Sequence, residues 1–229
     1  MDITICITSF NRKSLLLNTL ESFKRYDSNR FNVVIVDDCS DESELLTNEE
    51  IFSYDFKVTY LPIKSNNQWW ICPVVPLKIV TTLVDTPKMI IQHAECSHNN
   101  DIFKVIDEEL GENDYIAFSC FALNQGVDVN NFTLSDGSWY CHSVHNQRPL
   151  HFCCAIHTDK FKLSGGYDLD MAKGFWYDDD MFLKSLNKIG VNVKISDSGM
   201  VLHQYHDSKW DTPNFEELRL RNWEIFNSK

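Results

Sequence analysis

Short runs of β-branched residues alternate with helical patterns, and this alternation restricts the fold more than any other feature of the sequence. Three such runs are predicted as strands near the start of the chain: Ile3–Thr8, Asn32–Val36 and Lys57–Leu61. Between the first two, Leu16, Leu20 and Phe23 recur at the spacing of one helix face. Strands that alternate with helices form a parallel, doubly wound sheet, which binds ligands beyond the carboxyl ends of its strands. We therefore predict an α/β domain whose ligand site lies where these strands end.

Composition excludes several classes of protein. The chain has 229 residues, of which 43% are hydrophobic and 24% charged, as expected for one globular domain with a full core. Its formal net charge of -12 argues against nucleic acid or an anionic membrane surface as the main partner. An acidic protein can still bind a nucleotide sugar when a metal ion neutralises the diphosphate.

The N-terminus and the cysteines together favour a cytoplasmic location. The first residues lack a basic region ahead of a long apolar run, so we do not expect a signal peptide. No stretch is long enough for a transmembrane helix. The eight cysteines include no CxxC pair, so we expect reduced core residues and neither a disulfide framework nor a zinc site. The oligomeric state stays open.

A glycine-rich turn, an aromatic run and three acids follow one another in the stretch Leu163–Leu186. Gly165 and Gly166 open the stretch, and the acids Asp178–Asp180 follow the aromatic run Phe175–Tyr177. Three apolar residues then recur at helical spacing: Phe182, Leu186 and Ile189. Acids at a helix N-terminus usually only complement the helix dipole. After a glycine-rich turn and an aromatic run, they also suit a pocket floor where an ionised carboxylate accepts a proton.

This stretch resembles the C-terminal motif of inverting glycosyltransferases with the GT-A fold, especially family 2 and the galactosyltransferase-like group. Their pattern is GG(F/Y)DE, a spacer, a glycine, an aromatic pair and (E/D)D before an amphipathic helix. The resemblance implies that Asp179 is the catalytic base and that Asp178 hydrogen-bonds the acceptor. It also implies that Gly165 and Gly166 help to bind the donor and that Trp176 contacts substrate.

The first 40 residues resemble family 2 glycosyltransferases in two further motifs. Those enzymes have a T-x-(Y/F)-N-R-like turn after the first strand and V-D-D-x-S at the end of the second. The resemblance implies that Thr8 and Asp37 contact the nucleobase, with Asp38 in support, and that Phe10 and Arg12 also bind the donor. A strand-end acid is not expected in the core. Each motif alone is also compatible with an ordinary polar strand end.

A cation site is predicted where the resembling enzymes carry a D-x-D motif. This chain has His-Ala-Glu instead, and Glu95 falls on the last Asp, a reasonable oxygen ligand for Mn²⁺ or Mg²⁺. Many GT-A enzymes place a late histidine on the metal, which favours His203 over His206. His93 and His98 could assist, although a single histidine is more often a hydrogen-bonded structural residue.

Four aromatic or imidazole side chains remain as candidates for substrate contact or core packing. In the resembling subgroup a W-Y-x-H segment and an H-F segment, which here lies within Arg148–Ile156, surround the acceptor site, and this makes Trp139 and His142 acceptor candidates. A loop that simply packs over the sheet is the equal alternative. Trp69 and Trp70 either pack on the donor or fill the core, and the core is favoured. A C-terminal surface helix is expected to pack Trp223 inward.

Taken with the resemblance, these patterns predict one GT-A domain over residues 1–229. About residues 1–98 would bind the nucleotide sugar, and about residues 99–229 would bind the acceptor and carry catalysis. The implied reaction is inverting transfer from a nucleoside diphosphate sugar, with UDP favoured, to a hydroxyl of a glycan or other acceptor. Two alternatives are an inactive nucleotide-sugar or glycan-binding protein and a sugar-1-phosphate nucleotidyltransferase. The segment SFNRKS lacks the glycines that the phosphate loop of the latter needs.

Overall fold

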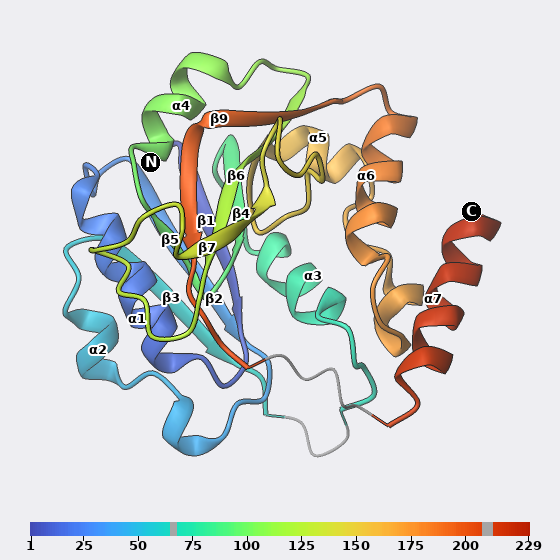
Figure 1. Cartoon of the computed structure of the whole chain (residues 1–229), viewed down its shortest axis with the longest axis horizontal. Coiled ribbons are helices and arrows are strands. Elements are labelled where there is room, and N and C mark those ends of the chain that lie inside the picture. The colour runs from blue at the N-terminus through green and yellow to red at the C-terminus, as the bar shows by residue number, and fades with distance from the viewer. Residues whose placement is uncertain (65–67, 208–212) are drawn as a thin grey trace.

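The computed structural model describes residues 1–64, 68–207 and 213–229, and one mixed sheet organises that part of the chain (Figure 1). The strands are β1 (Ile3–Ser9), β2 (Phe31–Asp37), β3 (Lys57–Pro62), β4 (Lys88–His93), β5 (Cys96–His98), β6 (Asp114–Leu123), β7 (Gly137–Cys141), β8 (Cys153–His157) and β9 (Asn192–His203). The helices are α1 (Lys13–Ser22), α2 (Asn48–Phe52), α3 (Val74–Thr82), α4 (Ile102–Glu109), α5 (Thr158–Leu163), α6 (Asp178–Lys188) and α7 (Phe215–Ser228), with short 3₁₀ turns η1 (Phe23–Arg25), η2 (Glu42–Glu44) and η3 (Leu169–Lys173).

The predicted parallel, doubly wound start of the chain is confirmed. The strand order is β3-β2-β1-β4-β8-β6-β9-β5, with β7 paired to β6, and β1, β2, β3 and β4 run parallel. In β2 every residue from Phe31 to Asp37 is buried. Continuous burial of this kind is typical of parallel strands covered on both faces. Helix α3 packs on β1 and β2, and α1 packs against β5.

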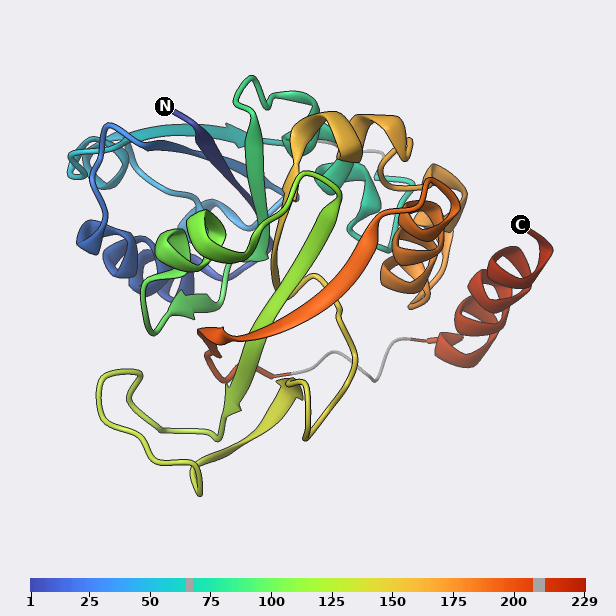
Figure 2. The same ribbon diagram turned by 90° about the horizontal axis from the view of Figure 1, so that it is seen from above.

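The second half of the sheet is mixed. Strand β8 runs antiparallel to both β4 and β6, while β9 runs parallel to β6 over most of its length (Figure 2). The sequence predicts two separate strands, Val191–Ile195 and another that begins near Met200. The structure joins them as one strand whose register with β6 shifts after Phe118. Gly199 lies at this irregularity, where a Cβ atom would come within 2.5 Å of the Phe118 ring.

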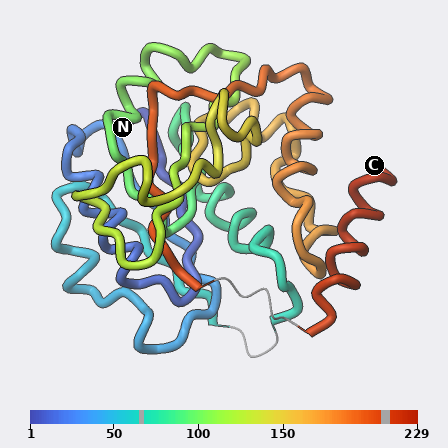
Figure 3. The backbone as a smooth tube through the Cα atoms, viewed as in Figure 1, coloured from blue at the N-terminus to red at the C-terminus, as the bar shows by residue number. Residues whose placement is uncertain are grey.

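Helix α7 packs on the segment that leads into α6, and the tube in Figure 3 shows these two helices side by side. The predicted C-terminal helix is confirmed, but the inward packing of Trp223 is wrong, because its side chain is 46% exposed. Its neighbour Asn222 is fully buried and donates to the carbonyls of Met171 and Trp176 at 3.0 Å. Gly174 permits this approach, since a Cβ there would lie 2.2 Å from Asn222 Oδ1.

The carboxyl ends of the strands gather the polar residues at one edge of the sheet. Because β1 and β2 are in register from Ile3 opposite Phe31, their ends place Ser9 opposite Asp37. Along the same edge, the backbone N–H of His93 donates to the carbonyl of Phe152 at 3.1 Å. Chain segments that are distant in sequence therefore meet where the ligand site is predicted.

The cysteines and the helices add two facts. All eight cysteines are free, and seven of them are buried. Within the described ranges, the helices lack the combination of length and apolar composition needed to cross a bilayer.

Candidate functional site

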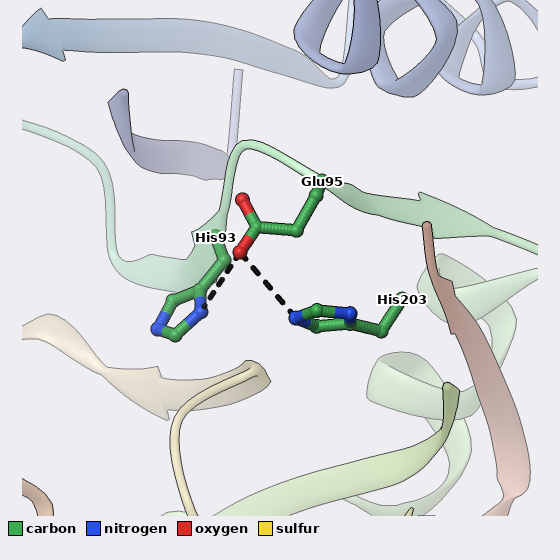
Figure 4. Close-up of side chains that lie close together, drawn as sticks. All are labelled: His93, Glu95 and His203. Carbon is green, nitrogen blue, oxygen red and sulfur yellow. Dashed lines mark ion pairs between the residues drawn. The ribbon is translucent and has the colours of Figure 1, made fainter. Parts of the chain in front are cut away.

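Three imidazoles surround one carboxylate oxygen at the sheet edge. Glu95 lies in the turn between β4 and β5, where His93 ends β4. Its Oε1 atom lies 3.6 Å from His93 Nδ1 and 3.4 Å from Nε2 of His203, the last residue of β9. His206 Nε2 lies 3.3 Å from the same oxygen. Figure 4 shows His93 and His203 approaching it from two sides, so the structure brings the predicted ligands Glu95 and His203 together.

Buried hydrogen bonds fix the turn that carries Glu95. The side chain of Gln92 donates from Nε2 to the carbonyl of Cys96 at 3.0 Å, which clamps the turn from both ends. His98 lies 2.8 Å from Gln92 Oε1 through Nε2 and 2.8 Å from the Tyr26 hydroxyl through Nδ1. Burial lowers the pKa of His98 to about 3, so this ring is neutral. The suggestion that His98 assists a metal is therefore wrong, because both of its nitrogens hold the scaffold.

Glu95 is ionised although it is buried. Burial by itself would raise its pKa, but hydrogen bonds from His203, His206 and His93 hold the pKa well below its usual range. The hydrogen bond to Glu95 in turn raises the pKa of His206. The cluster therefore holds one buried carboxylate anion, which hydrogen bonds from three imidazoles stabilise.

The donor set fits a divalent transition metal. Ligands of a tetrahedral ion with bonds of about 2.1 Å lie roughly 3.4 Å apart, and the Glu95 oxygen lies 3.3–3.6 Å from three imidazole nitrogens. Imidazole suits transition metals, whereas Mg²⁺ prefers oxygen ligands. His93, Glu95 and His203 would hold the ion. Arg12, which precedes α1, places Nη2 2.9 Å from His206 Nδ1 and so adds a cation beside the cluster.

The nucleotide candidates lie where β1 and β2 end, and two loops are tied together there. The side chain of Asn11 donates to Asp41 Oδ2 at 3.0 Å, and the Asp41 N–H returns a bond to Asn11 Oδ1 at 2.9 Å. Asn11 also takes a left-handed φ of 50°, a conformation that asparagine tolerates better than most residues. Thr8 is partly buried beside this turn and Phe10 is 39% exposed.

Asp37 and Asp38 are more deeply placed than the sequence predicts. Asp37 is only 1% exposed and accepts bonds of 2.8 Å from both the N–H and the hydroxyl of Ser40, so the expectation that it lies outside the core is wrong. Asp38 accepts a 2.7 Å bond from Trp70 Nε1. Burial raises the pKa of both acids. Trp70 is 8% exposed, as the preference for core packing predicts, whereas Trp69 is 50% exposed.

The three acids stand in the first turn of α6, as predicted. Asp179 forms a close ion pair with Nδ1 of His151, a residue just ahead of β8. Burial by itself would raise the pKa of Asp179, but the charge and hydrogen bond of His151 lower it, and His93 and Arg148 add to this effect. Burial and the charge of Asp179 raise the pKa of Asp178 to about 6. The two neighbouring acids therefore differ in proton affinity, and Asp179 is the one that stays ionised.

Aromatic rings connect the carboxylates to the imidazole cluster. The rings of His151 and His93 lie 5.5 Å apart, His93 and Phe152 5.4 Å, and Phe152 and His203 5.7 Å. Tyr140 extends the row, with its ring 5.0 Å from His203. The acids of α6 and the candidate metal ligands are thus connected by one row of neighbouring rings, which we call the wall of the site: His151, His93, Phe152, His203 and Tyr140.

The acceptor candidates Trp139 and His142 do not line this wall directly. Trp139 packs 5.0 Å from Phe121 and 4.3 Å from His142. Successive side chains of a strand point to opposite faces, so Tyr140 meets His203 while Trp139 faces away. The sequence reasoning missed Tyr140, although it is the Y of the same W-Y-x-H segment.

Gly165, Gly166 and Trp176 have clear roles in shaping the chain. Gly165 and Gly166 take left-handed φ values of 84° and 64°, and a Cβ on Gly166 would lie 2.8 Å from the Phe161 ring. The Gly165 carbonyl accepts a 3.2 Å bond from Lys78 Nζ. Trp176 is 47% exposed, and Trp176 and Tyr177, which directly precede the acids, both have positive φ values, 61° and 62°.

Comparison with known proteins agrees with this geometry. Residues 4–70 match the sequence model of glycosyl transferase family 2. The fold is the GT-A fold of glycosyltransferases. The predicted fold is thereby confirmed, and the family resemblance is supported by the match over residues 4–70. No curated protein sequence matches the chain significantly.

Three GT-A structures illustrate the likeness. TarS 1-349 of S. aureus, in complex with UDP-GlcNAc, has a TM-score of 0.70 and 15% identity, covering 99% of this chain and 67% of TarS 1-349. GalNAc-T7 with UDP, GalNAc and Mn²⁺ has a TM-score of 0.71 and 13% identity, covering 98% of this chain and 48% of the GalNAc-T7 chain. The mannosyltransferase PcManGT of Pyrobaculum calidifontis, with GDP-Man and Mn²⁺, has a TM-score of 0.62 and 11% identity. The likeness covers 91% of this chain and 58% of the PcManGT chain. This chain thus spans 48–67% of their lengths.

Replacing Asp178 should stabilise this GT-A domain at neutral pH. Because folding raises the Asp178 pKa to about 6, its anion costs stability progressively between about pH 4 and 6, and fully above pH 6. We expect Asp178→Asn to raise the free energy of unfolding at pH 7.5 by about 1–3 kcal/mol and to lose this advantage at pH 4. Denaturant titrations at both pH values measure it. Asp159→Asn, at an exposed first-turn acid of α5, is the control, and equal gains in both variants would contradict the pKa shift.

Manganese should stabilise the protein through Glu95. A ligand that binds only the native state at 100 times its Kd adds about 2.7 kcal/mol, so Mn²⁺ should raise the melting temperature by several degrees and Mg²⁺ by less. Glu95→Gln should abolish the manganese shift. His145→Gln, at an exposed histidine outside the cluster, should retain it. An unchanged shift in Glu95→Gln would place the ion elsewhere.

Proposed function

We propose that this chain is a metal-assisted inverting glycosyltransferase that moves a sugar from a nucleoside diphosphate sugar to an acceptor hydroxyl. The observation that carries the proposal is the continuity of the site. An ionised carboxylate, Asp179, and a buried anion–imidazole cluster, Glu95 with its histidines, lie on one wall joined by the rings of His151 and His93. A base and a site for the leaving diphosphate are what a single displacement at an anomeric carbon requires.

Asp179 supplies the proton acceptor. Its carboxylate takes the proton of the acceptor hydroxyl while that oxygen bonds to the anomeric carbon. The bond from this carbon to the diphosphate breaks at the same time, and the nucleoside diphosphate leaves with the electron pair. One displacement without a covalent intermediate inverts the anomeric configuration. Asp178, the neighbouring acid, hydrogen-bonds the acceptor and orients it.

The leaving group is held between the imidazole cluster and Arg12. A bound divalent cation would supply Lewis-acid stabilisation of the diphosphate. Glu95, His93 and His203 would hold that ion, and Arg12 stands beside His206 to meet a phosphate oxygen. The Mn²⁺ in the structures of GalNAc-T7 and PcManGT supports manganese as the cofactor.

The nucleoside is assigned to the ends of β1 and β2. Asp37, Thr8 and Asp38 face the base, with Phe10 at the exposed rim. The UDP of the TarS and GalNAc-T7 structures supports a UDP-sugar, while the GDP-Man of PcManGT leaves guanine as the competitor. Gly165 and Gly166 shape the turn on the donor side.

The acceptor approaches over Tyr140 and Trp176, which expose 39% and 47% of their side chains near the acids and the cluster. Aromatic faces stack on the apolar faces of sugars, which supports a glycan as acceptor. Trp139 and His142, which pack 4.3 Å from each other, are acceptor candidates outside this wall. The eight free cysteines support a reducing compartment, in keeping with the cytoplasm.

A binding protein without transferase activity is the second candidate. Three imidazoles already neutralise Glu95, where the resembling enzymes carry two aspartates. Release of nucleoside diphosphate in the presence of Mn²⁺ separates the two functions, because a binding protein holds the donor intact.

Donor binding should depend on the charge of Asp37. The variant Asp37→Asn can keep both contacts with Ser40, because that hydroxyl can also accept. It loses the ionised acceptor, and a hydrogen bond to a charged group contributes about 1.5–3 kcal/mol, so donor Kd should rise roughly 10- to 100-fold. Calorimetry with Mn²⁺ and UDP-GlcNAc, UDP-GalNAc, UDP-galactose, UDP-glucose or GDP-mannose measures it. Glu42→Gln in the following turn is the control. Unchanged affinity in a folded Asp37→Asn protein would remove Asp37 from the site.

Turnover should depend on Asp179. The variant Asp179→Asn keeps the shape and removes the proton acceptor, so kcat should fall about 10²–10⁴-fold while the Kd of the donor is retained. Asp178→Asn should cost less, since that residue only orients the acceptor. Near wild-type kcat in Asp179→Asn would reject the mechanism. A loss confined to Asp178→Asn would assign the base to that neighbour.

A further inference from the structure

We propose that His151 is a positioning residue that holds Asp179 and presents one of its carboxylate oxygens to the acceptor. This inference rests on the proposed function of Asp179 as base. His151 lies 28 residues before Asp179 in the sequence and belongs to the H-F segment that the resemblance places at the acceptor site, but no motif links it to Asp179.

The pairing has a defined geometry. Nδ1 of His151 faces Oδ1 of Asp179, and both atoms are buried. The side chain of Asp179 nevertheless keeps 24% of its surface accessible. With Oδ1 turned inward onto His151, Oδ2 is the oxygen left to meet an acceptor hydroxyl. A single N–H donor therefore decides which oxygen acts as base.

The imidazole is itself held in place. His151 is 2% exposed, and its ring meets the edge or face of Tyr167 at 5.3 Å and of His93 at 5.5 Å, both nearly perpendicular. Its backbone position is fixed because the next residue, Phe152, accepts the N–H bond of His93. A reacting group oriented in this way needs no reorganisation when the acceptor arrives.

The pairing also distinguishes two adjacent acids. Asp178 interacts with the thiol of Cys72 and feels His151 only through its charge, whereas Asp179 forms the close ion pair with the His151 ring. Two neighbouring carboxylates in one helix turn repel each other, and a donor on only one of them selects which becomes the base. An apolar side chain would fill the same buried space without the cost of burying an imidazole.

A purely structural role is the competing explanation, since the pair also links α6 to the start of β8. Three substitutions separate the two roles. The Asn side-chain amide overlays Nδ1 of histidine, the Gln amide overlays Nε2, and Phe fills the space without a donor. We expect His151→Phe to lower kcat by roughly 10- to 100-fold, the range for losing a partner that orients a reacting group. His151→Asn should recover most of kcat and His151→Gln should not.

The rates are those of nucleoside diphosphate release, with Mn²⁺, from whichever of the five nucleotide sugars named above is turned over. His157→Phe, at the far end of β8, is the matched control and should keep full activity. The donor Kd should stay constant in every His151 variant, because the pair acts only on the chemical step. Should His151→Phe fail to fold, the comparison of Asn with Gln still decides the question.

A double-mutant cycle isolates the coupling to Asp179. If His151 acts through Asp179, the double variant His151→Phe/Asp179→Asn should be no slower than Asp179→Asn alone. In the protein without substrate, ¹H–¹⁵N spectra of labelled histidines provide a second readout. The His151 Nδ1 signal, assigned by its loss in His151→Asn, should shift in Asp179→Ala and stay in place in Asp159→Asn.

Several results would overturn the proposal. These are equal activity of the Asn and Gln variants, additive losses in the double variant, or a Nδ1 signal that ignores Asp179→Ala. Full kcat in His151→Phe while Asp179→Asn is inactive would reject the role of His151 and leave the proposed function intact. Full kcat in Asp179→Asn would instead reject the base on which both proposals rest.

Discussion

The antiparallel pairing of β8 with β4 is the constraint on which the rest of the site depends. It places Cys153 opposite Gln92, so the residues just ahead of β8 arrive beside the end of β4. His151 and His93 become neighbours through this pairing, although 58 positions, 151 − 93, separate them. A parallel strand at the same place would begin at the opposite edge of the sheet. The reversal of direction is thus what joins the acids of α6 to the imidazole cluster.

The site concentrates charges that a stable fold would avoid. Glu95, Asp37 and His151 are each less than 10% exposed, and burial of an ionised group is unfavourable unless it is paired. Each is paired within the protein, to imidazoles, to Ser40 and to Asp179 respectively. Such pairs add little net stability, because desolvation offsets most of the attraction. These pairs instead orient the charged side chains, because the surrounding core fixes the position of each charged atom.

Sequence reasoning recovered β1, β2, β3, α6 and the polar strand ends because their signals are local. β-branched runs, helical spacing and the acids of α6 each depend on neighbours within a few residues. Glu95 and His203 were paired by resemblance, and the structure brings them to 3.4 Å. Asp37 was expected outside the core because its position after an apolar run suggests a strand end. Its burial comes from the loop that folds Ser40 back over it.

The positions of the residues that sequence reasoning missed depend on which face of a strand or helix each occupies and on the register between distant strands. Choosing Trp139 over Tyr140 requires knowing which face β7 turns to the site, and the pairing of β7 with β6 sets that face. Trp223 and Asn222 differ by one residue, or about 100° of helix rotation, and close packing around Gly174 selects the small amide. His151 lies in the H-F segment that the resemblance places at the acceptor site, but its pairing with Asp179 carries no local signal, because the path of the chain through β8 and α6 sets that pairing.

The charge balance of the cluster gives a physical reason for the replacement of D-x-D. In the proposed function, two aspartates would neutralise a divalent ion fully, whereas Glu95 with neutral imidazoles would leave one positive charge for the diphosphate. Arg12 adds a second charge next to His206. In a chain of net charge -12, this local excess would provide the attraction that the surface as a whole lacks.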